Sequence, residues 1–151
     1  MSIYKPPKNI ARRNRDRKSV FLAGSIEMGK AEDWQWALTN VFHERGYHVL
    51  NPRRDDWDSS WTQDFENSQF FQQVTWELNA LENADLIVMY FAPETKSPIS
   101  LLELGLHAHS GKIRVVCPNG FWRKGNVDIV CQYYNIPLYE NFETLLTDLN
   151  I

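Results

Sequence analysis

Cysteine is scarce in this sequence of 151 residues, and long apolar runs are missing. Cys117 and Cys131 are its only cysteines, and they form neither a CxxC pair nor a spacing typical of metal ligands. We therefore expect two buried thiols in a reducing compartment, which favours a cytoplasmic protein. No stretch approaches the roughly 18 apolar residues that a membrane span needs, and the N-terminus lacks the apolar core of a signal peptide. These absences predict a protein without a membrane partner.

Two nucleotide-binding motifs are also missing. The sequence contains no P-loop and no GxGxxG turn, which argues against NTP hydrolysis and dinucleotide redox chemistry. His107 and His109 are two residues apart on an expected helix, so they face different sides and cannot act as a metal pair. We therefore expect neither a metal ion nor a cofactor.

Charge is unevenly distributed along the chain. The first 19 residues hold seven of the 16 basic residues and one of the 19 acidic residues, so the remainder is strongly acidic. A basic arm over residues 1–18 suits contact with nucleic acid. However, the acidic body offers no basic face to continue such a contact, which favours a solvated tail or a strap across a neighbouring acidic subunit. We therefore divide the chain into this arm and one domain over residues 19–151, and expect no nucleic-acid partner.

Short apolar segments alternate with helical patterns through this domain. We expect strands at residues 19–24, 47–50, 85–91, 113–117 and 137–139. We expect helices at residues 34–46, 70–84, 97–111 and 127–134, and a last helix capped by Asn141. Parallel crossovers are right-handed and neighbouring elements pack together. This order therefore predicts an α/β fold, a flavodoxin-like doubly wound sheet of about five mainly parallel strands flanked by helices.

The polar segment over residues 51–61 follows the second expected strand and is dense in Arg, Asp and Trp. Open α/β sheets place their ligands at the carboxyl ends of strands. We therefore expect this segment to bind substrate through Asn51, Arg53, Asp56 and Trp57. The alternative is a solvated loop whose opposite charges pair with one another.

Two expected helices carry acidic residues beside apolar ones. On the first, Phe70, Val74, Leu78 and Leu81 form the expected apolar face, and Glu77 lies at its edge. An acid at that edge is either a helix-surface charge or part of a site.

The helix that begins at Ser97 and Pro98 combines a capping hydroxyl with a proline at its first position. Leucines on nearly every side predict a largely buried helix, and Glu103 lies in its second turn, where the positive helix end favours an ionised carboxylate. A buried unpaired carboxylate is costly, so it should meet a partner or a ligand. The residues alone leave two interpretations: Glu103 ties two elements together by pairing with an arginine or a hydroxyl, or it acts in a site.

Three motifs together resemble the nucleoside 2-deoxyribosyltransferase family and its glycosidase relatives. They are FLAG at residues 21–24, WEL-x-x-L-x-x-AD-x-I at residues 76–87, and SPISLLELG at residues 97–105. The resemblance covers about residues 19–135. It implies cleavage or transfer at the N-glycosidic bond of a (deoxy)nucleoside or nucleoside monophosphate. It also implies that Glu103 attacks the anomeric carbon, that the base leaves, and that the ribosyl ester is passed to another base or to water.

The resemblance implies roles for further residues. Glu77 falls where the family has an acid that handles the base. Ser97 stands where a second acid is expected, and Glu94 is the neighbouring candidate for that role. A hydroxyl can hydrogen-bond a base but cannot protonate it at neutral pH. Gly24 and Ser25 would line the sugar pocket by close backbone approach. Asn126 falls where the family borrows an asparagine from a neighbouring subunit, which implies a homo-oligomer with a shared active site.

Substrate phosphorylation and two competing functions stay open. Arg53, Arg54, Arg123 and Lys124 lie on expected loops and suit recognition of a 5′-phosphate. One competing function is a non-catalytic nucleotide-binding sensor on the same fold, in which Glu103 holds a ribose hydroxyl without attacking. The other is a nucleotide or NAD N-glycosidase in a signalling or defence role.

Overall fold

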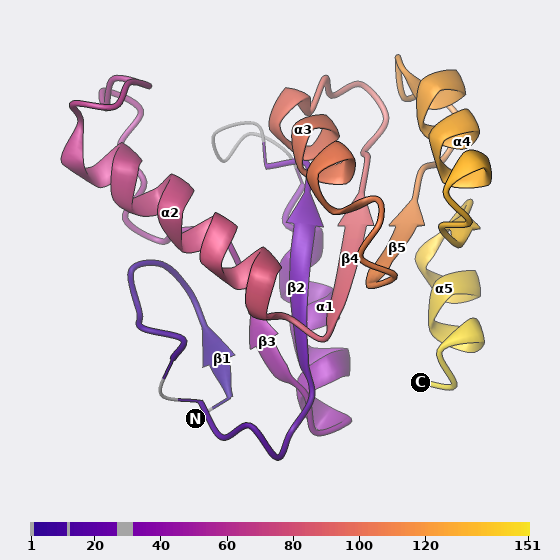
Figure 1. The fold of residues 1–151 in the computed structure, drawn as a ribbon, viewed down its shortest axis with the longest axis horizontal. Coiled ribbons are helices and arrows are strands. Elements are labelled where there is room, and N and C mark those ends of the chain that lie inside the picture. Colours follow the sequence, from indigo (N-terminus) through magenta and orange to yellow (C-terminus); the bar gives the residue numbers. More distant parts are fainter. Residues whose placement is uncertain (1, 12, 27–31) are drawn as a thin grey trace.

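A computed structural model describes residues 2–11, 13–26 and 32–151 of the chain (Figure 1). Over these ranges, six strands form one sheet and five helices flank it. The strands are β1 (Ile3–Tyr4), β2 (Ser19–Gly24), β3 (His48–Leu50), β4 (Leu86–Tyr90), β5 (Ile113–Val116) and β6 (Leu138–Tyr139). The helices are α1 (Trp34–Glu44), α2 (Ser68–Asn83), α3 (Pro98–His107), α4 (Lys124–Tyr133) and α5 (Phe142–Asp148).

All paired strands run parallel, in the order β1-β3-β2-β4-β5-β6. From β3 to β6 this is the flavodoxin-like order, and β1 extends the sheet at one edge. The expected doubly wound α/β fold is thus confirmed. The winding direction switches between β2 and β4, where Gly24 is in register with Tyr90. Sheets of this kind bind ligands at the carboxyl ends of the strands beside such a switch.

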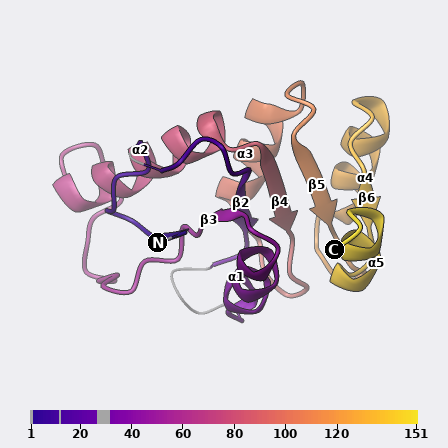
Figure 2. The ribbon, with the colours of Figure 1, turned by 90° about the horizontal axis from the view of Figure 1, so that it is seen from below.

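Helices cover both faces of the sheet (Figure 2), and two clusters of buried side chains hold these layers together. Helices α2, α3 and α4 pack on one face of the sheet against side chains that include Phe21 and Met89. Helices α1 and α5 pack on the other face, against Leu22 and Val88 among others. The central strands are continuously apolar because both of their faces are covered.

Polar caps and one glycine set the ends of several helices. Asp33, Asn67 and Asn141 each accept a hydrogen bond from the backbone N–H three residues ahead, at 3.1, 2.9 and 2.8 Å. Each side chain satisfies one of the backbone donors that a helix start leaves without a partner. Gly46 follows α1 with φ 84°, a left-handed conformation that favours glycine. The predicted cap at Asn141 and the predicted stop near Gly46 are both confirmed.

The buried face of α2 differs from the prediction. Its buried residues are Gln73, Trp76, Ala80 and Leu81, whereas Leu78 is 41% exposed. The apolar spacing predicted the wrong buried face because the structure buries the polar side chain of Gln73 and leaves Leu78 partly exposed. The inward face of α2 is therefore rotated toward the side that carries Glu77.

Helix α3 is shorter and more exposed than predicted. It ends at His107, not at Gly111. Ile99, Leu102 and Leu106 are 58%, 59% and 56% exposed and share one face of the helix, which we call the α3 stripe. The prediction of a largely buried helix is wrong because only the opposite face packs on the sheet.

The basic N-terminal segment lies against the domain along its described residues. Strand β1 pairs with β3, and Ile10 is 2% exposed. Trp76 donates its indole N–H to the Lys8 carbonyl at 2.9 Å, and Arg13 donates to the Asn83 carbonyl at 2.7 Å. The prediction of a solvated tail is therefore wrong for these residues. The charge pattern missed this packing because a two-residue strand has no readable periodicity and its partners lie far along the chain.

Cys117 and Cys131 are both buried free thiols, as the sequence predicts. Among the described residues, no helix is long and apolar enough to span a membrane. Within the same ranges, no group of three or more His, Cys, Asp or Glu side chains could hold a metal ion. The cytoplasmic location stays a prediction.

Candidate active site

The site begins at the carboxyl ends of β2 and β4. Ser25 donates its backbone N–H to the Tyr90 carbonyl at 3.0 Å, and Trp34 donates its indole N–H to the Ser25 carbonyl at 3.0 Å. Gly24 has φ 138°, and a Cβ at this position would clash with the backbone of Tyr90. Glycine is thus required at this position because the backbone of the neighbouring strand β4 passes close to Gly24. Contact between Gly24 and a sugar stays a prediction.

Three side-chain hydroxyls meet at this point and form what we call the hydroxyl cluster. Ser25 Oγ lies 2.6 Å from Ser97 Oγ and 3.0 Å from Thr95 Oγ1, and the last two are 3.0 Å apart. Ala92 donates its backbone N–H to Ser25 Oγ at 2.9 Å, and Thr95 donates to the Ala92 carbonyl at 2.8 Å. The cluster ties the end of β2 to the loop that leads into α3.

Ser97 does not cap α3 with its side chain, so that prediction is wrong. Its backbone is left-handed, with φ 46°, and its hydroxyl belongs to the hydroxyl cluster. A left-handed non-glycine residue costs on the order of 1–3 kcal/mol and persists only where its surroundings hold it. Glu94, in the same loop, is also left-handed with φ 68° and is exposed. The hydroxyl cluster therefore sets the start of the helix that carries Glu103.

Glu103 is buried in α3, with 7% of its surface exposed. It accepts no hydrogen bond and forms no ion pair with the residues that the structure describes. Burial, and second the nearby charge of Glu77, raise the pKa of Glu103 well above its ordinary value. Burial and repulsion thus act against the helix end, which the sequence argument expects to favour an ionised carboxylate. Pairing with an arginine or a hydroxyl is not found among the described residues.

Glu77 lies on α2, and its charge acts on the carboxyl of Glu103. It is half-buried, and Gln73 donates from Nε2 to its Oε1 at 3.0 Å. Burial raises the pKa of Glu77 to about 7, against a smaller lowering by the Gln73 hydrogen bond. We call Glu77 and Glu103 the carboxyl pair. Both pKa values are shifted in the same direction, so the carboxyl pair holds protons at a pH where ordinary glutamates are ionised.

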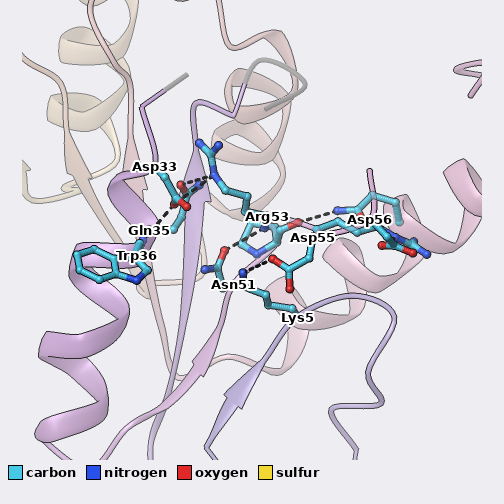
Figure 3. A network of polar contacts seen from close by, with 11 residues as sticks. Lys5, Asp33, Gln35, Trp36, Asn51, Arg53, Asp55 and Asp56 are labelled. Carbon is cyan, nitrogen blue, oxygen red and sulfur yellow. Dashed lines mark hydrogen bonds and ion pairs between the residues drawn. The ribbon is translucent and has the colours of Figure 1, made fainter. Parts of the chain in front are cut away.

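The segment over residues 51–61 is held by its own polar contacts (Figure 3). Asn51 is buried and accepts from the backbone N–H of Arg53 at 2.9 Å. Arg53 pairs with Asp33 at 3.2 Å and also donates to Gln35 Oε1 at 3.3 Å and to the Glu32 carbonyl at 3.0 Å. These contacts fasten the segment to the start of α1.

The next residues of this segment form a second set of contacts. Arg54 Nε lies 2.6 Å from Asp56 Oδ1, and its guanidinium sits over the Trp61 ring at 4.9 Å. Trp57 contacts Trp61 edge-on, with ring centroids 5.1 Å apart. Arg54 Nη1 and Trp57 Nε1 are buried donors without a partner among the described residues. The internal pairing favours the alternative of a charge-paired loop, and substrate binding by Arg53, Asp56 and Trp57 stays a prediction.

The residues expected after β5 lie on or beside α4. Asn126 is exposed in the first turn of α4. Lys124 donates to the Cys117 carbonyl at 2.8 Å and contacts Asp128 and Glu140, at 3.2 and 3.1 Å. Arg123 lies over the Trp122 ring at 4.4 Å. The structure thus places Asn126 on the surface, in a helix two strands away from β2.

Sequence reasoning missed two residues near the site. Gln73 contacts Glu77 directly, and its signal was available because it lies four residues earlier on the same helix. Thr95 joins the hydroxyl cluster from a loop, where no periodicity marks it.

The fold and the carboxyl pair together define a doubly wound α/β protein with an acidic site beside the topological switch point. The chain belongs to the nucleoside 2-deoxyribosyltransferase-like family, whose model matches residues 17–121. The matched range includes the carboxyl pair and the hydroxyl cluster, and it ends before α4. Proteins of this family are generally enzymes, and membership implies a nucleoside substrate. No curated protein matches the chain.

Proposed function

We propose that the protein cleaves or transfers the N-glycosidic bond of a (deoxy)nucleoside through a covalent ribosyl ester on Glu103. The observation that carries this proposal is the carboxyl pair. Two acidic side chains lie together in a buried place with no basic partner among the described residues. Burial of two such groups destabilises the fold, and perturbed acids of this kind gather at catalytic sites. Family membership supports the choice of reaction.

The proposed reaction has two steps. In the first, a Glu103 carboxylate oxygen bonds to the anomeric carbon while the bond to the base breaks. The electron pair of that bond goes to the base nitrogen, which takes a proton from Glu77. In the second step, a new base or water gives a proton to Glu77 and bonds to the anomeric carbon, and Glu103 leaves as a carboxylate. Atoms and charge balance over the cycle without a cofactor.

We favour a nucleoside over a nucleoside monophosphate as substrate. Arg53, Arg54 and Lys124 already pair with carboxylates, and Arg123 stacks on an indole ring. A 5′-phosphate would have to displace these contacts. A rate ratio of monophosphate to nucleoside far above one would contradict this part of the proposal.

We also propose a homo-oligomer in which a second copy completes the site. Asn126 is exposed, and α3 and α4 both carry exposed apolar side chains: the α3 stripe is more than half exposed, as are Ile129 and Tyr133 of α4, at 68% and 77%. Apolar surface of this extent is typical of an interface between subunits. A second copy placed there would bring its own Asn126 toward the helix that carries Glu103.

Mass spectrometry with a slow 2-fluoro-2-deoxynucleoside tests the covalent step. We expect a mass increase of one fluorodeoxyribosyl group, located on the peptide that contains Glu103. Glu103→Gln should not form the adduct, whereas Glu82→Gln, which changes an exposed acid of α2, serves as a control and should form it. An adduct on another residue, or none on any nucleoside tested, contradicts the proposal.

Product analysis separates the possible outcomes. With a deoxynucleoside and a second free base, a new nucleoside indicates a transferase, whereas free base and free sugar indicate a hydrolase. NAD belongs in the same panel because it also contains an N-glycosidic bond. If Glu103→Ala loses affinity for nucleosides and the wild type shows no turnover, the protein is a sensor.

A mixing experiment tests the shared site. Glu103→Gln and Asn126→Ala are each expected to be inactive alone. In a dimer co-expressed from both genes, one site of each mixed dimer carries neither change, so about a quarter of all sites should be active. Activity no higher than that of the single variants would contradict a shared site.

A further inference from the structure

Gln73 makes a contact that the proposed reaction does not yet use. Its side chain is 6% exposed, one turn before Glu77 on α2. Its Nε2 donates both to the Pro52 carbonyl and to Glu77 Oε1, each at 3.0 Å. The carbonyl of Pro52 can only accept, so the amide cannot be turned around without losing this bond. The position of the Gln73 donor is therefore fixed by the backbone.

This contact makes the two members of the carboxyl pair unequal. Glu77 receives a hydrogen bond that favours its ionised form, whereas Glu103 receives none from the described residues. The only charged group found to act on Glu103 is Glu77, and Gln73 is the only polar side chain found to act on Glu77, within the part of the chain that the structure describes. A hydrogen-bond donor favours the ionised form of the carboxylate that accepts it, so a pair that holds a single proton should carry its charge on Glu77.

We propose that Gln73 is a positioning residue that holds the carboxyl of Glu77 in place and keeps the shared proton on Glu103 until a nucleoside binds. This inference rests on the proposed function, in which Glu103 attacks as a carboxylate. In the free protein the shared proton would then be on Glu103, whereas the reaction requires it on Glu77. Binding must move one proton: the O–H bond of Glu103 breaks, an O–H bond of Glu77 forms, and no net charge is gained or lost.

The bound nucleoside supplies a reason for the proton to move. Sugar hydroxyls that donate to Glu103 stabilise its carboxylate, and a base nitrogen that accepts from Glu77 stabilises its protonated form. In the free protein neither contact exists. Gln73 therefore keeps the nucleophile neutral in the absence of substrate.

Carbon-13 NMR of the glutamate carboxyl groups in the ligand-free protein tests the inference without any turnover. Glu77→Gln and Glu103→Gln assign the two signals. In the wild type, we expect the Glu77 signal to titrate at about pH 7 while Glu103 stays protonated. In Gln73→Met, which keeps the volume but removes the donor, the Glu77 midpoint should rise by about one pH unit, and Glu103 should become partly ionised at a pH where it is protonated in the wild type.

Gln72→Met is the matched control, because Gln72 is exposed on the same helix. Its two titrations should equal those of the wild type. Gln73→Asn is a second variant, since it keeps an amide but withdraws the donor by one methylene, and it should move the midpoints in the same direction as Gln73→Met. Wild-type midpoints in both Gln73 variants, with native backbone spectra, would overturn the inference.

The pH dependence of kcat/KM separates this inference from the proposed function. The one-proton state is the reactive one, so activity should rise through about pH 7, and this acid limb should move upward by about one unit in Gln73→Met. Shifted NMR titrations with no wild-type turnover on any nucleoside would retain the positioning role and reject the function. Wild-type turnover with unshifted titrations would retain the function and reject the role of Gln73.

Discussion

The carboxyl pair and the charged segment over residues 51–61 are neighbours that differ in how their charges are balanced. The segment places Arg53 and Arg54 against Asp33 and Asp56, at 3.2 and 2.6 Å. The carboxyl pair has no cation among the described residues, and its members repel each other. Paired charges account for the shape of a loop. Buried like charges do not stabilise a fold, so their presence calls for a ligand or a reaction.

Glu103→Gln should have the largest effect on activity. It removes the proposed nucleophile, so kcat should fall by about 10³-fold or more in a nucleoside cleavage assay. The thermal midpoint should stay the same or rise at pH 8, because an amide needs no proton to remain neutral in this buried place. A large loss of stability with little loss of activity would mean that Glu103 is structural.

Glu77→Gln should have the second largest effect. The loss of a proton donor should lower kcat by about 10²-fold with ordinary nucleosides. An N7-methylated purine nucleoside has a cationic base that leaves without a proton, so its cleavage should be nearly unaffected. Equal losses on both substrates would show that Glu77 does not protonate the base. Glu82→Gln, an exposed acid on the same helix, is the control.

Stability should depend on pH through the carboxyl pair. A raised pKa means that the folded state holds the proton more tightly than the unfolded chain. The resulting stabilisation is present below the ordinary value of 4.5 and is lost as pH rises through about 7 for Glu77. The loss amounts to about 3 kcal/mol for this residue. Urea unfolding of the wild type and of Glu77→Gln between pH 5 and pH 8 measures it, and parallel curves for the two proteins would contradict it.

Asp56→Asn should have the smallest effect. Asp56 is mostly exposed, and asparagine keeps an oxygen that can accept from Arg54, whose own side chain is 5% exposed. We expect kcat/KM to stay within about threefold of the wild type. A tenfold rise of KM with unchanged kcat would instead support substrate binding by this segment.

The sequence predicted most of the sheet because its strands are buried on both faces. Runs such as residues 86–90 are continuously apolar, and this pattern needs no knowledge of distant contacts. Strand β1 was missed because it has two residues and depends on a partner at β3. Local sequence patterns were therefore enough to predict the central strands. The edge strand depends on long-range pairing, which the sequence does not reveal.

The candidate site was predicted in part for a related reason. The motifs marked Glu103 and Glu77, but their mutual repulsion depends on how α2 and α3 pack on the sheet. The burial of Gln73 depends on a carbonyl at Pro52, and the hydroxyl of Ser97 turns to Ser25, which lies 72 residues earlier. Polar side chains whose partners lie far along the chain leave no periodic pattern in the sequence. The buried face of α2 and the cap of α3 were therefore mispredicted for the same reason.

The docked N-terminal segment has a consequence for the order of folding during synthesis. Residues 2–11 are made before the rest of the domain, and their partners in β3 and at Trp76 are made much later. Chains fold from the N-terminus as they are synthesised, so this segment must wait until α2 has been made. Lys5 and Lys8 therefore lie on an undocked segment of the nascent chain at first. They take their places on the folded domain only after the helix that carries Glu77 has been made.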